Sequence, residues 1–156
     1  MKNKFLIFLL LIFIFLVTGC DDSYKIVYCT RSVDDSANNI SASMRYELYY
    51  DNDYYVRKSV SNEQITSTNS DVIDKYKKAY EDSFSLYKDI SYYTNTIKVD
   101  NNTLTSLTII DYDKVDYKKI LEIEGDDGNI FTKDGKVKLD TLIERYQKTG
   151  SKCYGN

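Results

Sequence analysis

Residues 44–61 read MRYELYYDNDYYVRKSVS, and this stretch decides the fold. In its first arm, Met44–Tyr50, every second residue is apolar, which predicts a half-buried strand because successive side chains in a strand point to opposite faces. The central Asp51–Asp53 has the composition of a tight turn, since Asn and Asp tolerate left-handed backbone. The second arm, Tyr54–Ser61, places Tyr54, Val56 and Val60 on one face. We therefore expect an antiparallel hairpin.

A second hairpin is expected further along the chain. Residues 92–99 and 104–112 are rich in Thr, Ile, Val and Tyr, and residues 100–103 join them as a turn. Between the hairpins, residues 71–88 carry apolar side chains at helical spacing with charged residues opposite, which predicts an amphipathic helix. The predicted apolar stripe consists of Val72, Tyr76, Ala79, Tyr80, Phe84 and Tyr87.

The remaining segments complete an α+β fold. We expect a strand over residues 24–30, a polar loop over 31–43, a short helix over 116–123, and a last helix over 140–148 that ends at a left-handed Gly150. Strands that come as hairpins predict an antiparallel sheet with helices on one face. A β-sandwich is less favoured, because a helix interrupts the strands. The predicted core consists of Leu48, Val56, Tyr76, Tyr80, either Leu107 or Ile109, Leu142 and Ile143.

The first twenty residues have the pattern of a lipoprotein signal peptide. Lys2 and Lys4 precede an apolar run over residues 5–17, which is shorter than the roughly 20 residues that a membrane-spanning helix needs. Val17-Thr18-Gly19-Cys20 then resembles a bacterial lipobox, in which the cysteine receives a diacylglyceryl group. We predict a signal peptide over residues 1–19, a short tether over 20–23 with lipidated Cys20, and one extracytoplasmic domain over 24–156. The alternative is an uncleaved anchor with an incidental cysteine.

Composition excludes several classes of function. Without Lys2 and Lys4, 19 basic side chains remain against 24 acidic ones, a net charge of −5 that disfavours nucleic-acid binding. The chain has no histidine, so a histidine general base or metal ligand is excluded. We expect no cofactor, no metal and no nucleic-acid partner. The expected location is the outer face of the bacterial cytoplasmic membrane, where the lipid anchor holds a domain that is otherwise monomeric.

Two cysteines remain once Cys20 is lipidated. Cys29 lies in the first predicted strand and Cys153 follows the last predicted helix. Disulfides persist outside the cytoplasm, and with two thiols left there is a single possible pairing. We predict a Cys29–Cys153 disulfide. The alternative is two unpaired cysteines buried as small apolar residues.

A family resemblance rests on these features and on two short motifs. The lipobox, the order of strand, hairpin, helix and hairpin, the sequence DYDKVDY at residues 111–117, and the Lys148-Thr149-Gly150 helix end together resemble the YehR-type small bacterial lipoproteins. The resemblance covers most of the mature chain. It implies an α+β fold and a lipid anchor, and it implies no particular activity.

Two sets of residues suggest chemistry but have simpler explanations. Ser85-Leu86-Tyr87-Lys88 matches S-x-x-K and residues 148–150 match K-T-G, the motifs of penicillin-binding proteins, yet no S-x-N motif lies between them. The acidic clusters lack the glycine and distal glutamate of a calcium loop, so we interpret them as turn formers and helix caps. These clusters are Asp51 with Asp53, Asp111 with Asp113 and Asp116, and Asp126 with Asp127.

The sixteen tyrosines suggest a binding surface. Tyr49 and Tyr55 alternate with the predicted core residues of the first hairpin, and Tyr93 is in a similar position on the second. Aromatic side chains on an open sheet face bind proteins or glycans, although tyrosine also covers small cores. We therefore predict a binding module for an unknown protein or glycan. The alternative is an accessory subunit of an envelope enzyme or transporter, and a carboxylate-based enzyme is least favoured.

Overall fold

One antiparallel sheet runs through the part of the chain that the computed structural model describes, residues 24–125 and 129–155. The strands are β1 (Lys25–Asp35), β2 (Ile40–Tyr50), β3 (Tyr55–Ser67), β4 (Tyr93–Asp100), β5 (Thr103–Asp111), β6 (Val137–Lys138) and β7 (Lys152–Gly155). The helices are α2 (Ser70–Ser85), α3 (Tyr117–Glu124) and α4 (Leu139–Lys148). Within these described residues, no helix is both long and apolar enough to cross a bilayer.

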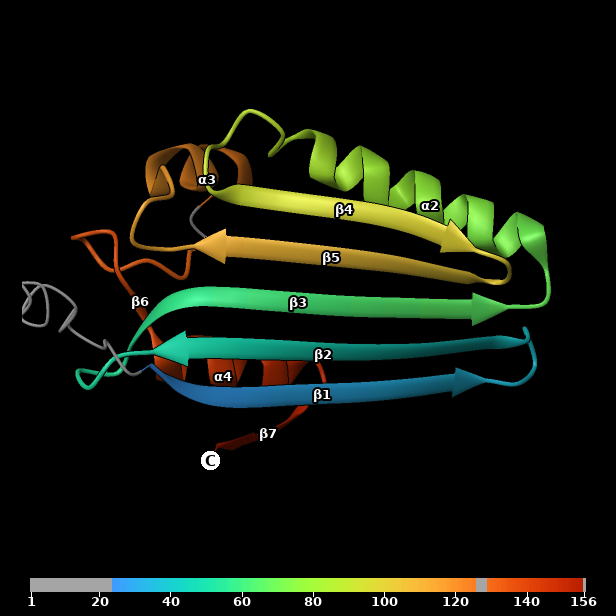
Figure 1. The fold of residues 1–156 in the computed structure, drawn as a ribbon, viewed down its shortest axis with the longest axis horizontal. Coiled ribbons are helices and arrows are strands. Elements are labelled where there is room, and N and C mark those ends of the chain that lie inside the picture. The colour runs from blue at the N-terminus through green and yellow to red at the C-terminus, as the bar shows by residue number, and fades with distance from the viewer. Residues whose placement is uncertain (1–23, 126–128, 156) are drawn as a thin grey trace, which may run out of the picture.

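The sheet confirms the predicted α+β class and both hairpins. The strand order is β4-β5-β3-β2-β1-β7, and β6 pairs with the start of β3 (Figure 1). In Figure 1, α4 lies behind β1 and β2, whereas α2 runs along β4. The short strands β6 and β7 were not predicted, because four residues or fewer carry no readable alternation.

The predicted loop over residues 31–43 is wrong. β1 and β2 pair continuously from Lys25↔Tyr50 to Asp35↔Ile40, so most of this segment extends the two strands. The turn is confined to residues 36–39, where the Asn38 amide donates to the Asp35 carboxylate at 3.2 Å. The polar composition that suggested a loop belongs instead to a largely exposed end of the hairpin, where strands need few apolar residues.

The predicted face of Val60 is wrong, because β3 contains a β-bulge. Tyr49 pairs with Lys58 and Tyr50 pairs with Val56, so Arg57 is an extra residue in β3. The extra residue reverses the alternation that follows it, because side-chain direction changes at every residue. Val60 therefore lies on the face opposite to Val56, and Ser59 is buried in its place. Tyr54, predicted on the core face as well, is 60% exposed in the turn.

Helices and core lie on one face of the sheet, in two separate hydrophobic clusters. The large cluster is built on β1, β2, α3 and α4, and includes the buried side chains Val27, Cys29, Leu48, Val56, Ile120, Val137, Leu139 and Leu142. The small cluster consists of Ile65, Ile73 and Leu104, with Tyr80 and Ile97 packed against it. Between the clusters, β3 and β5 place polar side chains on the same face: Ser61, Glu63, Ser106 and Thr108. The Glu63 carboxylate accepts hydrogen bonds from Tyr80 at 2.5 Å and from Tyr46 at 3.4 Å.

Several predicted core residues occupy other places. Leu48, Val56 and Leu142 are buried together and Ile143 packs against them, as predicted. Tyr76 is exposed. Ile73 points into the small cluster, so the buried stripe of α2 is shifted by one residue from the predicted stripe. Leu107 and Ile109 lie on the uncovered face, because β5 turns Leu104 and Ile110 toward the helices.

The ends of the helices follow their capping residues. Helix α2 ends at Ser85 rather than Lys88. Its N-cap is Asn69, whose side chain accepts from the Asp71 amide. At the end of α4, the predicted left-handed glycine is confirmed: Gly150 has φ +92°. The Ser151 amide donates to the Tyr146 carbonyl and the Gly150 amide to the Gln147 carbonyl, which is a Schellman motif.

Candidate binding surfaces

The face of the sheet opposite the helices is uncovered by any described element. The strand register places neighbouring side chains in rows across this face. Near the start of β1 the rows are apolar and aromatic, and we name these half-buried residues the open-face patch: Ile26, Tyr28, Tyr49, Val60, Leu107 and Ile109. Toward the far end of the hairpins the rows consist of hydroxyl and amide side chains, among them Ser43, Gln64 and Thr105. The open face thus combines an apolar half with a hydrogen-bonding half.

Cations and carboxylates hold the tyrosines of the open-face patch in place. The Tyr49 hydroxyl donates to Glu47 at 2.8 Å, and this hydrogen bond is the main reason that the pKa of Tyr49 is raised. The Lys58 ammonium lies 5.6 Å from the centre of the Tyr49 ring, and the Arg45 guanidinium lies 4.7 Å from that of Tyr28. Such cation–π contacts fix the rings while leaving their edges accessible. Tyr49 is therefore where the sequence predicted it, on an open sheet face.

Two aromatic residues of this surface were not predicted: Tyr28 of the open-face patch and Tyr154, which extends the patch. Tyr154 of β7 is 53% exposed and its ring lies 6.0 Å from that of Tyr28. The pairing of Tyr28 with Tyr154 across β1 and β7 brings them together. The alternation of residues 24–30 could have identified Tyr28, but nothing in the sequence indicated that the last residues form a strand.

Tyr55 and Tyr93 occupy different environments from Tyr49. Tyr55 is half-buried at the start of β3, where it pairs with Lys138 of β6 and has the Lys136 ammonium 4.9 Å from its ring centre. The prediction that Tyr93 faces away from the core is wrong. Its ring stacks on Tyr87 at 4.7 Å, it packs against the large cluster, and burial is the main reason that its pKa is raised. The strand alternation of β4 turns Tyr93, Asn95 and Ile97 toward the helices.

The bulge residue Arg57 fixes the end of the sheet beside the open-face patch. Its guanidinium bonds to Asp51 through Nε at 2.8 Å and to Asp113 through Nη1 at 2.6 Å. The bond to Asp113 is the main cause of the raised pKa of Arg57. Desolvation alone would raise the pKa of Asp51, but the hydrogen bonds from the Tyr55 amide and Arg57 outweigh it and hold that pKa below its usual value. This ion-paired cluster stabilises the turns and offers no free carboxylate pair.

A cleft lies between α2 and the edge strand β4. Its volume is about 550 Å³, within the range of small-ligand sites. Phe84 and Tyr87 line it from the helix side, and Tyr93 and Ile97 line it from the strand. Lys88 stands on its rim, exposed and with no ion-pair partner among the described residues. The Glu81 carboxylate on the same rim lies 3.7 Å from the Lys77 ammonium. The cleft is thus an aromatic groove beside an unpaired cation.

The structure separates the two penicillin-binding-protein motifs. Ser85 and Lys88 lie beside β4, at one edge of the sheet, whereas Lys148–Gly150 precedes β7 at the other edge. The Ser85 hydroxyl donates to the Asp82 carbonyl at 2.7 Å, and the Thr149 hydroxyl donates to the Tyr146 carbonyl at 2.8 Å. Each hydroxyl thus bonds to the backbone at the end of its own helix. The two motifs do not form one site.

The acidic clusters act in local structure. Asp51 accepts from the Asp53 and Tyr55 amides, Asp111 accepts from the Asp113 amide, and Asp116 caps α3 through the Lys119 amide. Asp126 and Asp127 lie outside the described residues. No group of three potential metal-ligating side chains occurs within residues 24–125 and 129–155.

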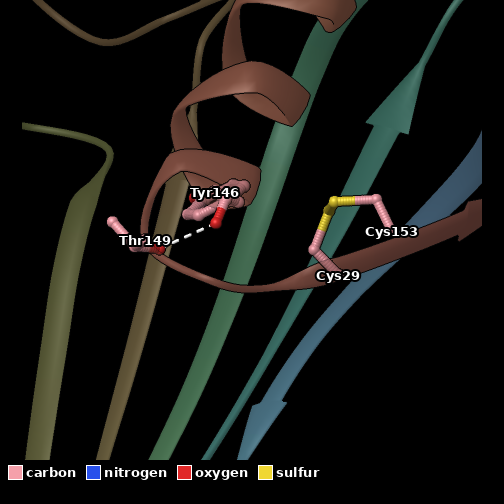
Figure 2. Close-up of a disulfide and its surroundings, with 4 residues drawn as sticks. All are labelled: Cys29, Tyr146, Thr149 and Cys153. Carbon is pink, nitrogen blue, oxygen red and sulfur yellow. Dashed lines mark hydrogen bonds between the residues drawn. A yellow bond between two sulfur atoms is a disulfide. The ribbon is translucent and has the colours of Figure 1, made fainter.

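The predicted disulfide is present between Cys29 and Cys153. The two residues face one another in the antiparallel pair β1–β7, with their Cα atoms 4.0 Å apart. Figure 2 shows the bond just beyond the end of α4, near the Thr149–Tyr146 hydrogen bond. Cys29 is fully buried in the large cluster. The bond therefore ties the last strand to the first and sets one edge of the sheet. Cys20 lies outside the described residues.

Comparison with known proteins supports the fold. The sequence matches no protein-family model and no curated protein. The fold is similar to the NMR structure of the E. coli YehR protein, with a TM-score of 0.53 and 18% sequence identity over 87% of this chain and 93% of that one. A protein from Streptococcus pneumoniae TIGR4, also solved by NMR, aligns over 88% of this chain and 90% of its own with 13% identity and a TM-score of 0.48. At 18% identity, the likeness to YehR is one of fold.

Proposed function

We propose that this protein is a lipid-anchored binding module of the YehR type, held at the outer face of the bacterial cytoplasmic membrane. The apolar run and lipobox that end at Cys20 support the anchor. The fold shared with YehR and the sequence motifs at residues 111–117 and 148–150 support the family. Two acyl chains on Cys20 supply a stable attachment, which a single chain does not.

The uncovered sheet face is the observation that carries the binding role. All three described helices pack on the other face, so Tyr28, Tyr49 and Tyr154 remain accessible beside aliphatic side chains. Aromatic residues of this kind dominate binding surfaces because they bring a large contact area with little conformational freedom to lose. The neighbouring hydroxyl and amide rows supply hydrogen bonds for orientation.

The anchor is tested by mass spectrometry and fractionation. We expect the mature protein to begin at a diacylated Cys20 and to partition with membranes, and Cys20→Ala to leave an unprocessed or released chain. Ser23→Ala is the matched control, because it changes a residue just beyond the lipobox and leaves both Cys20 and the disulfide intact. An unmodified Cys20 thiol in the wild-type protein would contradict the anchor.

The binding surface is tested by photo-crosslinking of the full chain in native membranes. A benzophenone amino acid replaces Tyr49 in one variant and Lys77, on the exposed side of α2, in the other. We expect a discrete adduct from position 49 and none from position 77. Susceptibility of the adduct to protease or to glycosidase then identifies the partner class. Equal or absent labelling at the two positions would contradict a binding role for this face.

A further inference from the structure

Strand β4 lies at the edge of the sheet, and its outer edge carries backbone groups that can form hydrogen bonds with another strand. It ends the strand order on the side opposite β7. The Asp111 amide donates to the Tyr92 carbonyl at 3.0 Å, which sets the alternation of the β4–β5 ladder. The backbone groups of Tyr93, Asn95, Ile97 and Val99 consequently point away from β5. The Tyr93 amide confirms this direction, since it donates to the Ile90 carbonyl instead of to β5.

No described residue uses the remaining outward groups. The amides of Asn95, Ile97 and Val99 and the carbonyls of the same residues have no backbone partner within residues 24–125 and 129–155. Proteins usually block such an edge with a proline, a bulge or a very short strand. This chain contains no proline, and β4 pairs over eight residues without a register shift. The edge is therefore open from Asn95 to Val99.

The cleft beside this edge suits the side chains of an added strand. Helix α2 runs along β4 (Figure 1), and the 550 Å³ cleft lies between them. The residues whose backbone faces outward are the ones that turn their side chains toward α2, so an added strand would place every second side chain against Phe84, Tyr87 and Tyr93. This geometry combines main-chain pairing for affinity with pockets for alternate side chains for specificity.

The charges of the cleft indicate one feature of the partner. Lys88 has no ion-pair partner among the described residues, whereas Glu81 on the same rim is close to Lys77. A carboxylate on the partner would therefore meet an available cation at the Lys88 end of the cleft, and a second cation would find no free carboxylate there.

We propose that β4 and the α2–β4 cleft bind an extended peptide segment of another protein, which adds a strand to the sheet, places an apolar side chain against Phe84, Tyr87 and Tyr93, and places a carboxylate beside Lys88. This site is separate from the open-face patch. The inference stands whether or not that patch binds a partner, because it rests on the strand edge and the cleft alone.

Selection and affinity measurements test the side-chain part of the inference. The full chain, purified in detergent, selects peptides from a random phage-displayed library, and fluorescence polarisation measures their affinity. We expect selected sequences to carry an acidic residue at a fixed distance from an apolar one. Lys88→Glu should weaken binding about tenfold, the effect of reversing a charge that contributes about 1.4 kcal/mol. The control Lys75→Glu reverses an exposed charge on α2 outside the cleft and should leave the affinity unchanged.

Two backbone measurements test the strand addition itself. Peptides N-methylated at one alternate set of amides should lose binding at least about tenfold, while methylation of the other set should be tolerated, because only one set faces β4. Bound peptide should also slow hydrogen exchange at the amides of Asn95, Ile97 and Val99. Failure to select any peptide, equal effects of the two methylation patterns, or unchanged exchange would overturn the inference. Concentration-dependent dimerisation that protects these three amides without peptide would assign the edge to a second copy of the chain and would overturn it as well.

Discussion

The two hydrophobic clusters of this protein lie on the same face of one sheet but are built very differently. The large cluster joins β1, β2, α3 and α4 and contains Cys29, the buried cysteine of the disulfide. The small cluster holds α2 on the sheet with three buried side chains, Ile65, Ile73 and Leu104. Ser61, Glu63, Ser106 and Thr108 separate them, because polar residues occupy the central positions of β3 and β5.

This difference indicates where the molecule is rigid and where it is adaptable. Local opening requires less free energy where few apolar contacts must be broken. Helix α2 and the Ile97 end of β4 pack on the small cluster and form the weakly packed half, although Tyr93 at the start of β4 packs against the large cluster. The disulfide and the Schellman motif at the end of α4 secure the other half. The fold therefore combines a fixed frame with a less stable edge at which a strand can be added.

The largest expected effect comes from removing the disulfide. The bond closes a loop with a sequence separation of 124, for which the chain-entropy model gives about 4–5 kcal/mol. We expect the double variant Cys29→Ala, Cys153→Ala to lose about this free energy of unfolding in urea titrations. Hydrogen exchange should accelerate first in β7 and β1. A loss below about 1 kcal/mol would show that the bond adds little to the frame.

Truncation within the large cluster should have the next largest effect. Leu142 of α4 is 2% exposed, so Leu142→Ala should reduce the free energy of unfolding by about 2–5 kcal/mol through lost burial and a residual cavity. Leu86→Ala is the control, since Leu86 is 63% exposed and its truncation should leave stability nearly unchanged. Similar losses in the two variants would mean that α4 is not docked as the structure shows.

The same truncation in the small cluster tests the comparison directly. Ile73→Ala should cost about 2 kcal/mol, the lower end of the usual range, because so small a cluster can partly collapse around the gap. We expect hydrogen exchange to accelerate in α2 and β4 while β1 and β2 keep their protection. Uniform acceleration throughout the sheet would show that the two clusters unfold as one unit.

Sequence patterns predicted the frame better than the surfaces. The first hairpin, the second hairpin and the stripe around Leu142 follow from alternation and helical spacing, which act within a few residues. The face of Val60 did not follow from alternation, because the bulge at Arg57 interrupts the alternation. The Arg57 side chain pairs with the nearby Asp51 and with Asp113, which is distant in the sequence. The packing of Tyr93 against the large cluster did not follow from the sequence pattern either. Whether an aromatic side chain of an edge strand faces helix or solvent depends on the register of the whole sheet, as does the pairing that places Tyr154 beside Tyr28.

Tyrosines buried on the helix-covered face should make the protein sensitive to alkali. Desolvation raises the pKa of Tyr112 and of Tyr46 well above 10, so the folded state keeps protons that the unfolded state releases. Stability is therefore retained up to about pH 10 and falls above it, by about 1.4 kcal/mol per pH unit for each such buried group. Urea titrations from pH 8 to 11 measure this slope.

A phenylalanine variant tests how much a buried tyrosine contributes to the alkaline slope. Tyr112→Phe should reduce the alkaline slope, because it removes a group that ionises only in the unfolded state. Leu86→Ala, which removes an exposed side chain without an ionisable group, should leave the slope unchanged. An unchanged slope in Tyr112→Phe would contradict the burial of that hydroxyl beside Ser59, whose hydroxyl lies 3.3 Å away.

The smallest expected effect comes from the N-terminal cap of α2, a feature that α4 lacks. Asn69 caps α2 by accepting from the Asp71 amide at 3.0 Å, whereas Lys138 at the N-cap position of α4 makes no side-chain cap bond. Asn69→Ala should therefore cost about 1 kcal/mol, and Asn69→Ser, which keeps a cap acceptor, should cost almost nothing. Thermal unfolding measures the difference. Because α2 has one buried side chain, Ile73, it depends on its cap, while α4 is held by Leu139 and Leu142. If Asn69→Ala has no effect, α2 is held by packing after all, and the small cluster is stronger than its three buried residues indicate.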